Sequence, residues 1–260
     1  MSLHIDTQGQ GEDIVLLHGW GFHGDVWEPV VSKLTKHYRV TCVDLPGYAR
    51  SQTTPDDIKT KTLDEITAIV AENVPDHATW AGWSFGGLLA LNQAINYPES
   101  INKLVLISST PQFAQTDDWI CAISGEFLHT FEEELENDYQ GIITRFLSLQ
   151  AKGCPDAREQ IRDLQAQIFK HGHPLIETLR NGLTLLQQTN LRPKLATVKI
   201  PTLLIAGEHD RLVPPAAIEA TQQAIPNATS FFIKNAGHAP CLSHPGIVAD
   251  RIITFLNEQQ

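Results

Sequence analysis

Three features are scarce in this sequence of 260 residues: cysteine, basic residues at the start of the chain, and long apolar runs. The four cysteines stand far apart, at positions 42, 121, 154 and 241, and they form no C-x-x-C pair. This spacing argues against a metal site and against a disulfide framework, and it suits a reducing cytosol. We therefore expect four inert core thiols.

The first residues, Met1–Asp6, contain no basic segment that leads into an apolar run, so we expect no secretory signal. No stretch approaches the roughly 18 apolar residues that would span a bilayer. Positive charge is also scarce, because 19 Lys and Arg face 30 Asp and Glu, for a formal net charge of −11. Nucleic acid and anionic membranes would repel such a chain, as would an acidic protein partner that met no local basic patch. We expect a cytoplasmic monomer that binds neither nucleic acid nor membrane.

Apolar residues are plentiful, at 42% of the chain, and their pattern is typical of a soluble globular α/β protein. Buried strands are predicted at 14–17, 38–43, 77–81, 103–107, 202–206 and 229–233. Helices are predicted near 26–36, 63–74, 85–97, 215–225 and 244–258. Apolar strands separated by helices indicate a mostly parallel, doubly wound sheet that is covered on both faces.

Residues 111–190 lack strand signals. The stretch Asp156–Phe169 places Ala157, Ile161, Leu164 and Ile168 on one helical face, and Tyr139–Gln150 is a second helical pattern. We therefore predict one structural domain, with a core formed by residues 1–110 and 191–260 and a helical lid formed by residues 111–190.

The stretch Gly82–Gly86 fits the motif G-x-S-x-G, between a predicted strand and a predicted helix. In this context the motif forms a strained turn that exposes the hydroxyl of Ser84 above the sheet edge and directs the N–H of Phe85 at the site of an oxyanion. The alternative is a glycine-rich turn with an incidental serine. Partners for Ser84 would decide between the two, because a serine hydroxyl needs an adjacent base.

His238 follows the last predicted strand after a short loop, so it should lie at the same sheet edge as Ser84 and act as the base. A carboxylate must orient its ring. Asp210 is our candidate and Glu208 the alternative, since both follow the strand at 202–206. The position after the preceding strand, Ser108–Thr110, offers no carboxylate. The order Ser, Asp, His is the order expected for an α/β-hydrolase.

The loop after the first buried strand contains His18–Gly21, and we assign the second oxyanion N–H to Trp20, beside that of Phe85. The indoles of Trp20 and Trp83 either wall the pocket or belong to ordinary core packing. Asp44, which is followed by Leu-Pro-Gly, is expected to shape a turn and hold a neighbouring loop rather than to take part in catalysis.

These motifs resemble the α/β-hydrolase superfamily over essentially the whole chain, and more closely the BioH group of pimeloyl-[acyl-carrier protein] methyl ester esterases in biotin synthesis. The likeness extends to Arg145–Gln150 in the lid. One departure is Ala49, where relatives usually have glycine.

The resemblance implies hydrolysis of a methyl ester at the far end of an acyl chain held by a carrier protein, without a metal or organic cofactor. Ser84, Asp210 and His238 would form the triad. The substrate would contact Trp20, Ser84, Phe85 and His238, and a channel would be lined by Phe146, Leu147, Ser148, Leu149 and Gln150.

Carrier proteins are acidic, so the docking surface should be basic. Arg145, Arg158 and Arg162 are the candidates for it, and a solvated helix face is the alternative. Two other functions stay open: a broader esterase for short acyl esters, and a ligand-binding receptor in which slow hydrolysis serves signalling.

Overall fold

The computed structural model describes residues 2–135, 139–150, 161–162, 165–166, 168–172 and 174–258. Seven strands form one sheet in the order β1-β3-β2-β4-β5-β6-β7. The strands are β1 (Ile5–Gly9), β2 (Asp13–Leu17), β3 (Arg39–Val43), β4 (Ala78–Trp83), β5 (Ile101–Ile107), β6 (Thr202–Gly207) and β7 (Ala228–Ile233). All neighbouring pairs are parallel except β1 with β3, so the sheet is mostly parallel as predicted.

Strand β1 was not predicted. Its sequence, IDTQG, is polar, and four of its five residues are exposed, because it lies at the sheet edge and pairs with β3 alone. By contrast, all six residues of β4 and all six of β6 are buried. Such strands are largely apolar, and this pattern allowed them to be predicted from the sequence.

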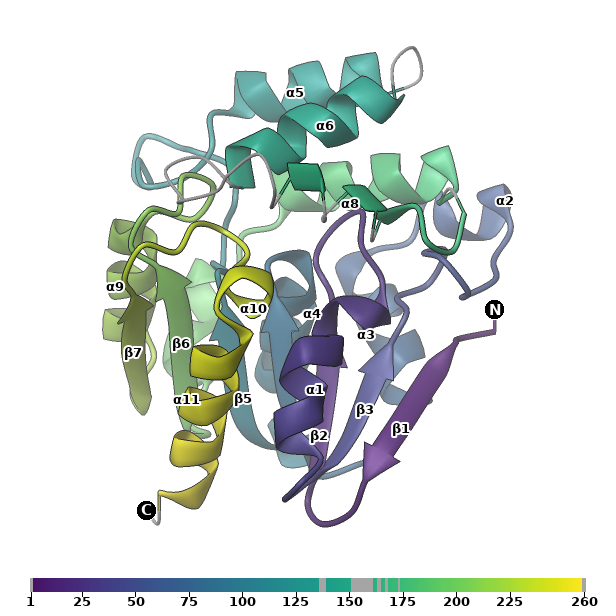
Figure 1. Cartoon of the computed structure of the whole chain (residues 1–260). Coiled ribbons are helices and arrows are strands. Elements are labelled where there is room, and N and C mark those ends of the chain that lie inside the picture. Colours follow the sequence, from purple (N-terminus) through teal and green to yellow (C-terminus); the bar gives the residue numbers. More distant parts are fainter. Residues whose placement is uncertain are drawn as a thin grey trace.

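Helices cover both faces of the sheet (Figure 1). One face carries α1 (Glu28–Leu34) and α11 (Pro245–Asn257), which pack against each other. The opposite face carries α3 (Leu63–Ala71), α4 (Phe85–Asn96) and α9 (Pro215–Ala224). Short helices α2 (Pro55–Ile58) and α10 (Pro240–Ser243) and the 3-10 turns η1 (Gly24–Trp27), η2 (Pro98–Ser100) and η3 (Arg192–Thr197) complete this part.

Residues 111–190, which we call the lid region, contain α5 (Gly125–Glu134), α6 (Tyr139–Gln150) and α8 (Ile176–Gln188). These helices lie beyond the carboxyl edge of the sheet, above the ends of the central strands (Figure 1). Within α8, the buried residues Leu179, Leu183 and Leu186 recur at helical spacing and face the core. Within the described part of the chain, no helix is both long and apolar enough to cross a membrane.

Candidate active site

Ser84 lies on a sharp turn between β4 and α4. Its φ of 54° is in the left-handed region, which costs energy for a residue with a side chain. Two glycines make the turn possible: a Cβ on Gly82 would lie 2.3 Å from the carbonyl oxygen of Gly86, and a Cβ on Gly86 would lie 2.4 Å from that of Leu17. The motif therefore has a steric cause, and the turn presents the serine hydroxyl at the sheet edge.

A chain of hydrogen bonds joins the three predicted triad residues. The Oγ of Ser84 lies 2.9 Å from the Nε2 of His238, and the Nδ1 of His238 lies 2.9 Å and 3.0 Å from the two carboxylate oxygens of Asp210. All three residues are nearly fully buried. With the Nδ1 proton directed at Asp210, Nε2 is free to accept the serine proton.

Asp210, and not Glu208, contacts the histidine. Its Oδ1 also accepts hydrogen bonds from the backbone N–H groups of Leu212 and Val213, each at 2.9 Å. These donors fix the carboxylate in the orientation that His238 requires. Glu208 is exposed and makes none of these hydrogen bonds.

The loop that follows β2 packs directly against the turn of Ser84, so the loop that carries Trp20 meets the turn that carries Phe85. A Cβ on Gly86 would lie 2.6 Å from the carbonyl oxygen of His18. His18 itself is a structural residue: its Nδ1 bonds the carbonyl of Gly19 at 2.8 Å and its Nε2 accepts from the N–H of Leu45 at 2.9 Å. Burial lowers the pKa of His18 to about 4, so the ring is neutral at pH 7 and can serve both bonds.

Neither predicted indole lines the pocket next to Ser84. Trp20 is buried, and its indole N–H donates to the carbonyl of Leu179 in α8 at 2.9 Å. Trp83 is also buried, and its indole N–H donates to the carbonyl oxygen of His238 at 2.7 Å. Both rings thus belong to the packed core, and each makes one specific hydrogen bond there.

The pocket above Ser84 and His238 is otherwise apolar. Its apolar lining comes from separate parts of the chain: Phe113, Ile123, Phe127, Leu128, Phe131, Leu183, Leu186 and Leu212. These residues were not predicted from the sequence as site residues. Only the Leu183–Leu186 pair leaves a readable signal, as part of the apolar stripe of α8.

A second, wider groove opens between α5 and α6 and shares Phe127 and Phe131 with the pocket. Arg145 and Ser148 line this groove. Leu147 is fully buried and lines neither space. Phe146, Leu149 and Gln150 belong to α6, but their side chains lie outside the described part of the structure.

Of the predicted docking arginines, Arg145 and Arg162 are exposed, and Arg158 lies outside the described residues. Arg145 forms an ion pair with Glu134 and lies 6.0 Å from the centre of the Phe131 ring. Its guanidinium therefore stands at the mouth of the groove, over an aromatic wall that the groove shares with the pocket.

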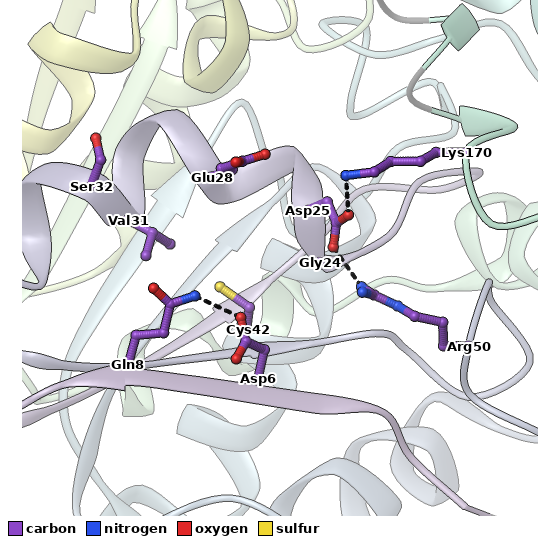
Figure 2. Close-up of a pocket in the computed structure, with 10 residues that line it drawn as sticks. All are labelled: Asp6, Gln8, Gly24, Asp25, Glu28, Val31, Ser32, Cys42, Arg50 and Lys170. Atoms are coloured by element: carbon purple, nitrogen blue, oxygen red, sulfur yellow. Dashed lines mark hydrogen bonds and ion pairs between the residues drawn. The ribbon is translucent and has the colours of Figure 1, made fainter.

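The described residues include one group with metal-ligand chemistry, formed by His23, Asp25 and His171. The carboxylate of Asp25 is already bonded by Arg50 at 2.7 Å, by Lys170 at 2.6 Å and by His171 at 2.8 Å. Figure 2 shows Arg50 and Lys170 each reaching a different carboxylate oxygen of Asp25. A metal ion would have to displace these cations. The group is therefore an ionic junction between the core and the lid region.

Burial alone would raise the pKa of Asp25, but Lys170, His171 and Arg50 together hold it well below its usual range. Arg50 also bonds Asp44, which accepts the N–H of Gly24 at 2.7 Å. Asp44 thus holds the neighbouring loop, as its Leu-Pro-Gly context predicted.

The chain matches the model of the alpha/beta hydrolase fold family over residues 14–245. It is 41% identical over 254 residues to a pimeloyl-[acyl-carrier protein] methyl ester esterase of Xanthomonas campestris pv. campestris, covering 98% of both chains. It is 37% identical to a protein of the same name from Vibrio vulnificus, covering 97% of both. Among solved structures, an esterase from Exiguobacterium antarcticum superposes with a TM-score of 0.89 at 20% identity, covering 98% of this chain and 96% of that one. The resemblance and fold class predicted from the motifs are therefore confirmed.

Proposed function

This chain belongs to the α/β-hydrolase fold family, and we propose that it is the esterase that hydrolyses the methyl ester of pimeloyl-[acyl-carrier protein] in biotin synthesis. The observation that carries the chemistry is the line of hydrogen bonds from Asp210 through His238 to Ser84, at the floor of an apolar pocket. Full-length relatives that bear this name, at 37–41% identity, support the substrate.

In this reaction the Oγ of Ser84 attacks the ester carbonyl carbon while the Nε2 of His238 accepts the serine proton. Asp210 stabilises the imidazolium that forms. The negative charge on the carbonyl oxygen would be met by the N–H groups of Trp20 and Phe85, whose loops are in contact beside Ser84.

His238 then gives its proton to the departing oxygen, so methanol leaves and the acyl group stays on Ser84. Water, activated by His238, attacks the acyl-enzyme and releases the free acid. Every proton and charge in this scheme is handled by a group of this chain, so we propose that no metal or organic cofactor takes part.

The apolar pocket favours an ester over an acid. Burying an ionised carboxylate without a partner costs several kcal/mol. The pocket's described lining offers only Ser84 and His238 as polar groups. An uncharged methyl ester carries no such cost, whereas the carboxylate product is disfavoured there and is released.

The lid region would select the substrate. The pocket and the outer groove share Phe127 and Phe131, whose rings pack against each other with centroids 4.4 Å apart. These rings would have to separate for an aliphatic chain whose ester lies at Ser84 to continue toward Arg145 and Ser148. Arg145 is exposed and lines this groove, and Arg162 is exposed elsewhere in the lid region. Together with Arg158 they would attract an acidic carrier although the whole chain has a net charge of −11. The protein would act as a cytoplasmic monomer.

The test compares kcat/KM for a pimeloyl-carrier methyl ester with kcat/KM for p-nitrophenyl esters of rising chain length. We expect the carrier-bound ester to be preferred, Ser84→Ala to be inactive on all of them, and the wild-type gene to rescue a biotin-requiring strain that lacks its own esterase. Failure to rescue, with a preference for short p-nitrophenyl esters, would identify a broad carboxylesterase instead. A single modification of Ser84 without turnover would identify a receptor.

A further inference from the structure

Trp83 connects the nucleophile to the base through a route that does not pass along the triad. It directly precedes Ser84 in the chain and is the last residue of β4. Its side chain is fully buried, and its indole N–H donates to the backbone carbonyl of His238 at 2.7 Å. The centre of its ring lies 6.1 Å from that of the His238 imidazole.

The indole is itself held firmly. The ring of Phe22 packs edge-on against it, with centroids 4.7 Å apart. Gly19 leaves room for it, because a Cβ there would lie 3.1 Å from the Cε3 of Trp83. The indole N–H thus points at the carbonyl of His238 from a fixed position, and loss of that acceptor would leave a buried donor unpaired.

The imidazole of His238 is oriented at its ring by Asp210 and Ser84, but these bonds do not fix the backbone from which the ring projects. His238 lies in the loop after β7, three residues beyond Asn235, whose φ of 58° is in the left-handed region. A displacement of about 1 Å at a catalytic group can reduce a rate about 100-fold. The Trp83 bond constrains the position of the His238 backbone, which the triad bonds leave open.

We propose that Trp83 is a positioning residue that holds the backbone of His238 at the distance where Nε2 meets the Oγ of Ser84. This inference rests on the serine mechanism of the proposed function, but it does not depend on the identity of the ester.

The test uses Trp83→Phe, which keeps an aromatic ring in the core and removes the N–H donor together with part of the volume of the indole. Trp80→Phe is the matched control, since Trp80 is a buried tryptophan of the same strand with no role in the site. Two rates are measured: turnover of p-nitrophenyl acetate and covalent modification of Ser84 by a small fluorophosphonate. For Trp83→Phe we expect kcat and the modification rate to fall about tenfold or more, with KM within about twofold of wild type.

A purely structural role would not alter the bond between His238 and Asp210. We therefore also expect the downfield NMR signal of the His238 Nδ1 proton to shift or broaden in Trp83→Phe and to stay unchanged in Trp80→Phe. If Trp83→Phe modifies Ser84 at the wild-type rate and keeps this signal, the inference is wrong, whereas activity in Ser84→Ala would instead overturn the serine mechanism.

If Trp83→Phe does not fold, hydrogen exchange in the wild-type protein decides the question. The selectively labelled indole N–H of Trp83 should exchange much more slowly than that of an exposed indole. Rapid exchange would show that the bond to His238 is absent in solution and would overturn the inference.

Discussion

The carboxyl edge of the sheet and the lid region above it are held by different kinds of interaction. At the sheet edge, the triad residues are at most 4% exposed, and their partners are buried backbone groups, glycine contacts and the indole of Trp83. The lid region instead meets the core through the stripe of α8 and through the ionic junction at Asp25, where Lys170 has a side-chain exposure of 45%. The interactions at the sheet edge are buried, whereas those at the junction are open to solvent and salt.

This contrast separates two functions. In the proposed reaction the buried edge carries the bond chemistry, which any ester can undergo. The lid region supplies most of the pocket wall and the groove that leads to the surface. Substitutions at the edge should therefore affect all esters alike, and substitutions in the lid region should change which ester is preferred.

The largest effect is expected for Ser84→Ala. Removing the nucleophile should lower kcat by about 10⁴- to 10⁶-fold, and to the same extent for p-nitrophenyl acetate and for a carrier-bound methyl ester. Steady-state rates on both substrates measure this, with circular dichroism as the control for folding. A loss that differed greatly between the two esters would contradict the separation of chemistry from selection.

The next effect concerns the pH dependence of core stability. His18 has a pKa of about 4 in the folded protein, where burial lowers it, and about 6.5 when unfolded. Below pH 6.5 the unfolded chain therefore binds a proton that the folded chain does not. As pH falls from 6.5 to 4, the free energy of unfolding should decrease by about 3 kcal/mol from this residue, and no further below pH 4.

Urea unfolding of the wild type and of His18→Asn between pH 7 and pH 4 measures this contribution. The variant should be less stable at pH 7, because it loses bonds to Gly19 and Leu45, and its stability should fall less steeply with acid. The exposed His77, replaced by Asn, is the control and should keep the wild-type slope. If the free energy of unfolding falls equally steeply with acid in the wild type and in His18→Asn, then His18 is not a buried, neutral imidazole in solution.

A smaller and selective effect is expected at the lid region. Replacing Arg145 and Arg162 together by Glu should lower kcat/KM for the carrier-bound ester about tenfold through weaker electrostatic association, and should leave turnover of p-nitrophenyl acetate unchanged. The charge-matched control is Lys36→Glu with Arg39→Glu, because both residues are exposed at the far edge of the core. Equal losses for the two double variants would show that overall charge, and not docking at the lid region, matters.

The same contrast explains how much the sequence predicted. Buried strands are continuous apolar runs, and parallel strands end at one edge, so Ser84, Asp210 and His238 could be placed together from their positions after β4, β6 and β7. Polar β1 gave no such signal. Pocket residues such as Phe113 and Phe127 come from separate stretches, and only the fold brings them together.

The ionic junction shows this limit most clearly. Lys170 and Asp25 are separated by 145 residues, and neither belongs to a motif. Pairwise attraction between surface charges has no sequence period, unlike the alternation of a strand or the stripe of a helix.

The smallest effect tests that junction. Asp25→Asn removes the charge that holds Lys170 and His171, while Arg50 keeps its bonds to Asp44. Exposed ion pairs contribute about 0.2–1 kcal/mol, so amide exchange at residues 168–172 should quicken about two- to fivefold, and 1 M salt should have a similar effect on the wild type.

Asp250→Asn is the control, because Asp250 forms an exposed ion pair with Lys33 between α1 and α11, and neither residue belongs to the lid region. Since the triad does not contact this junction, turnover of p-nitrophenyl acetate should stay within about twofold of wild type. If the exchange at 168–172 stays at the wild-type rate in Asp25→Asn, the ionic junction does not hold this part of the lid region, and the difference between the two regions is one of exposure rather than of interaction type.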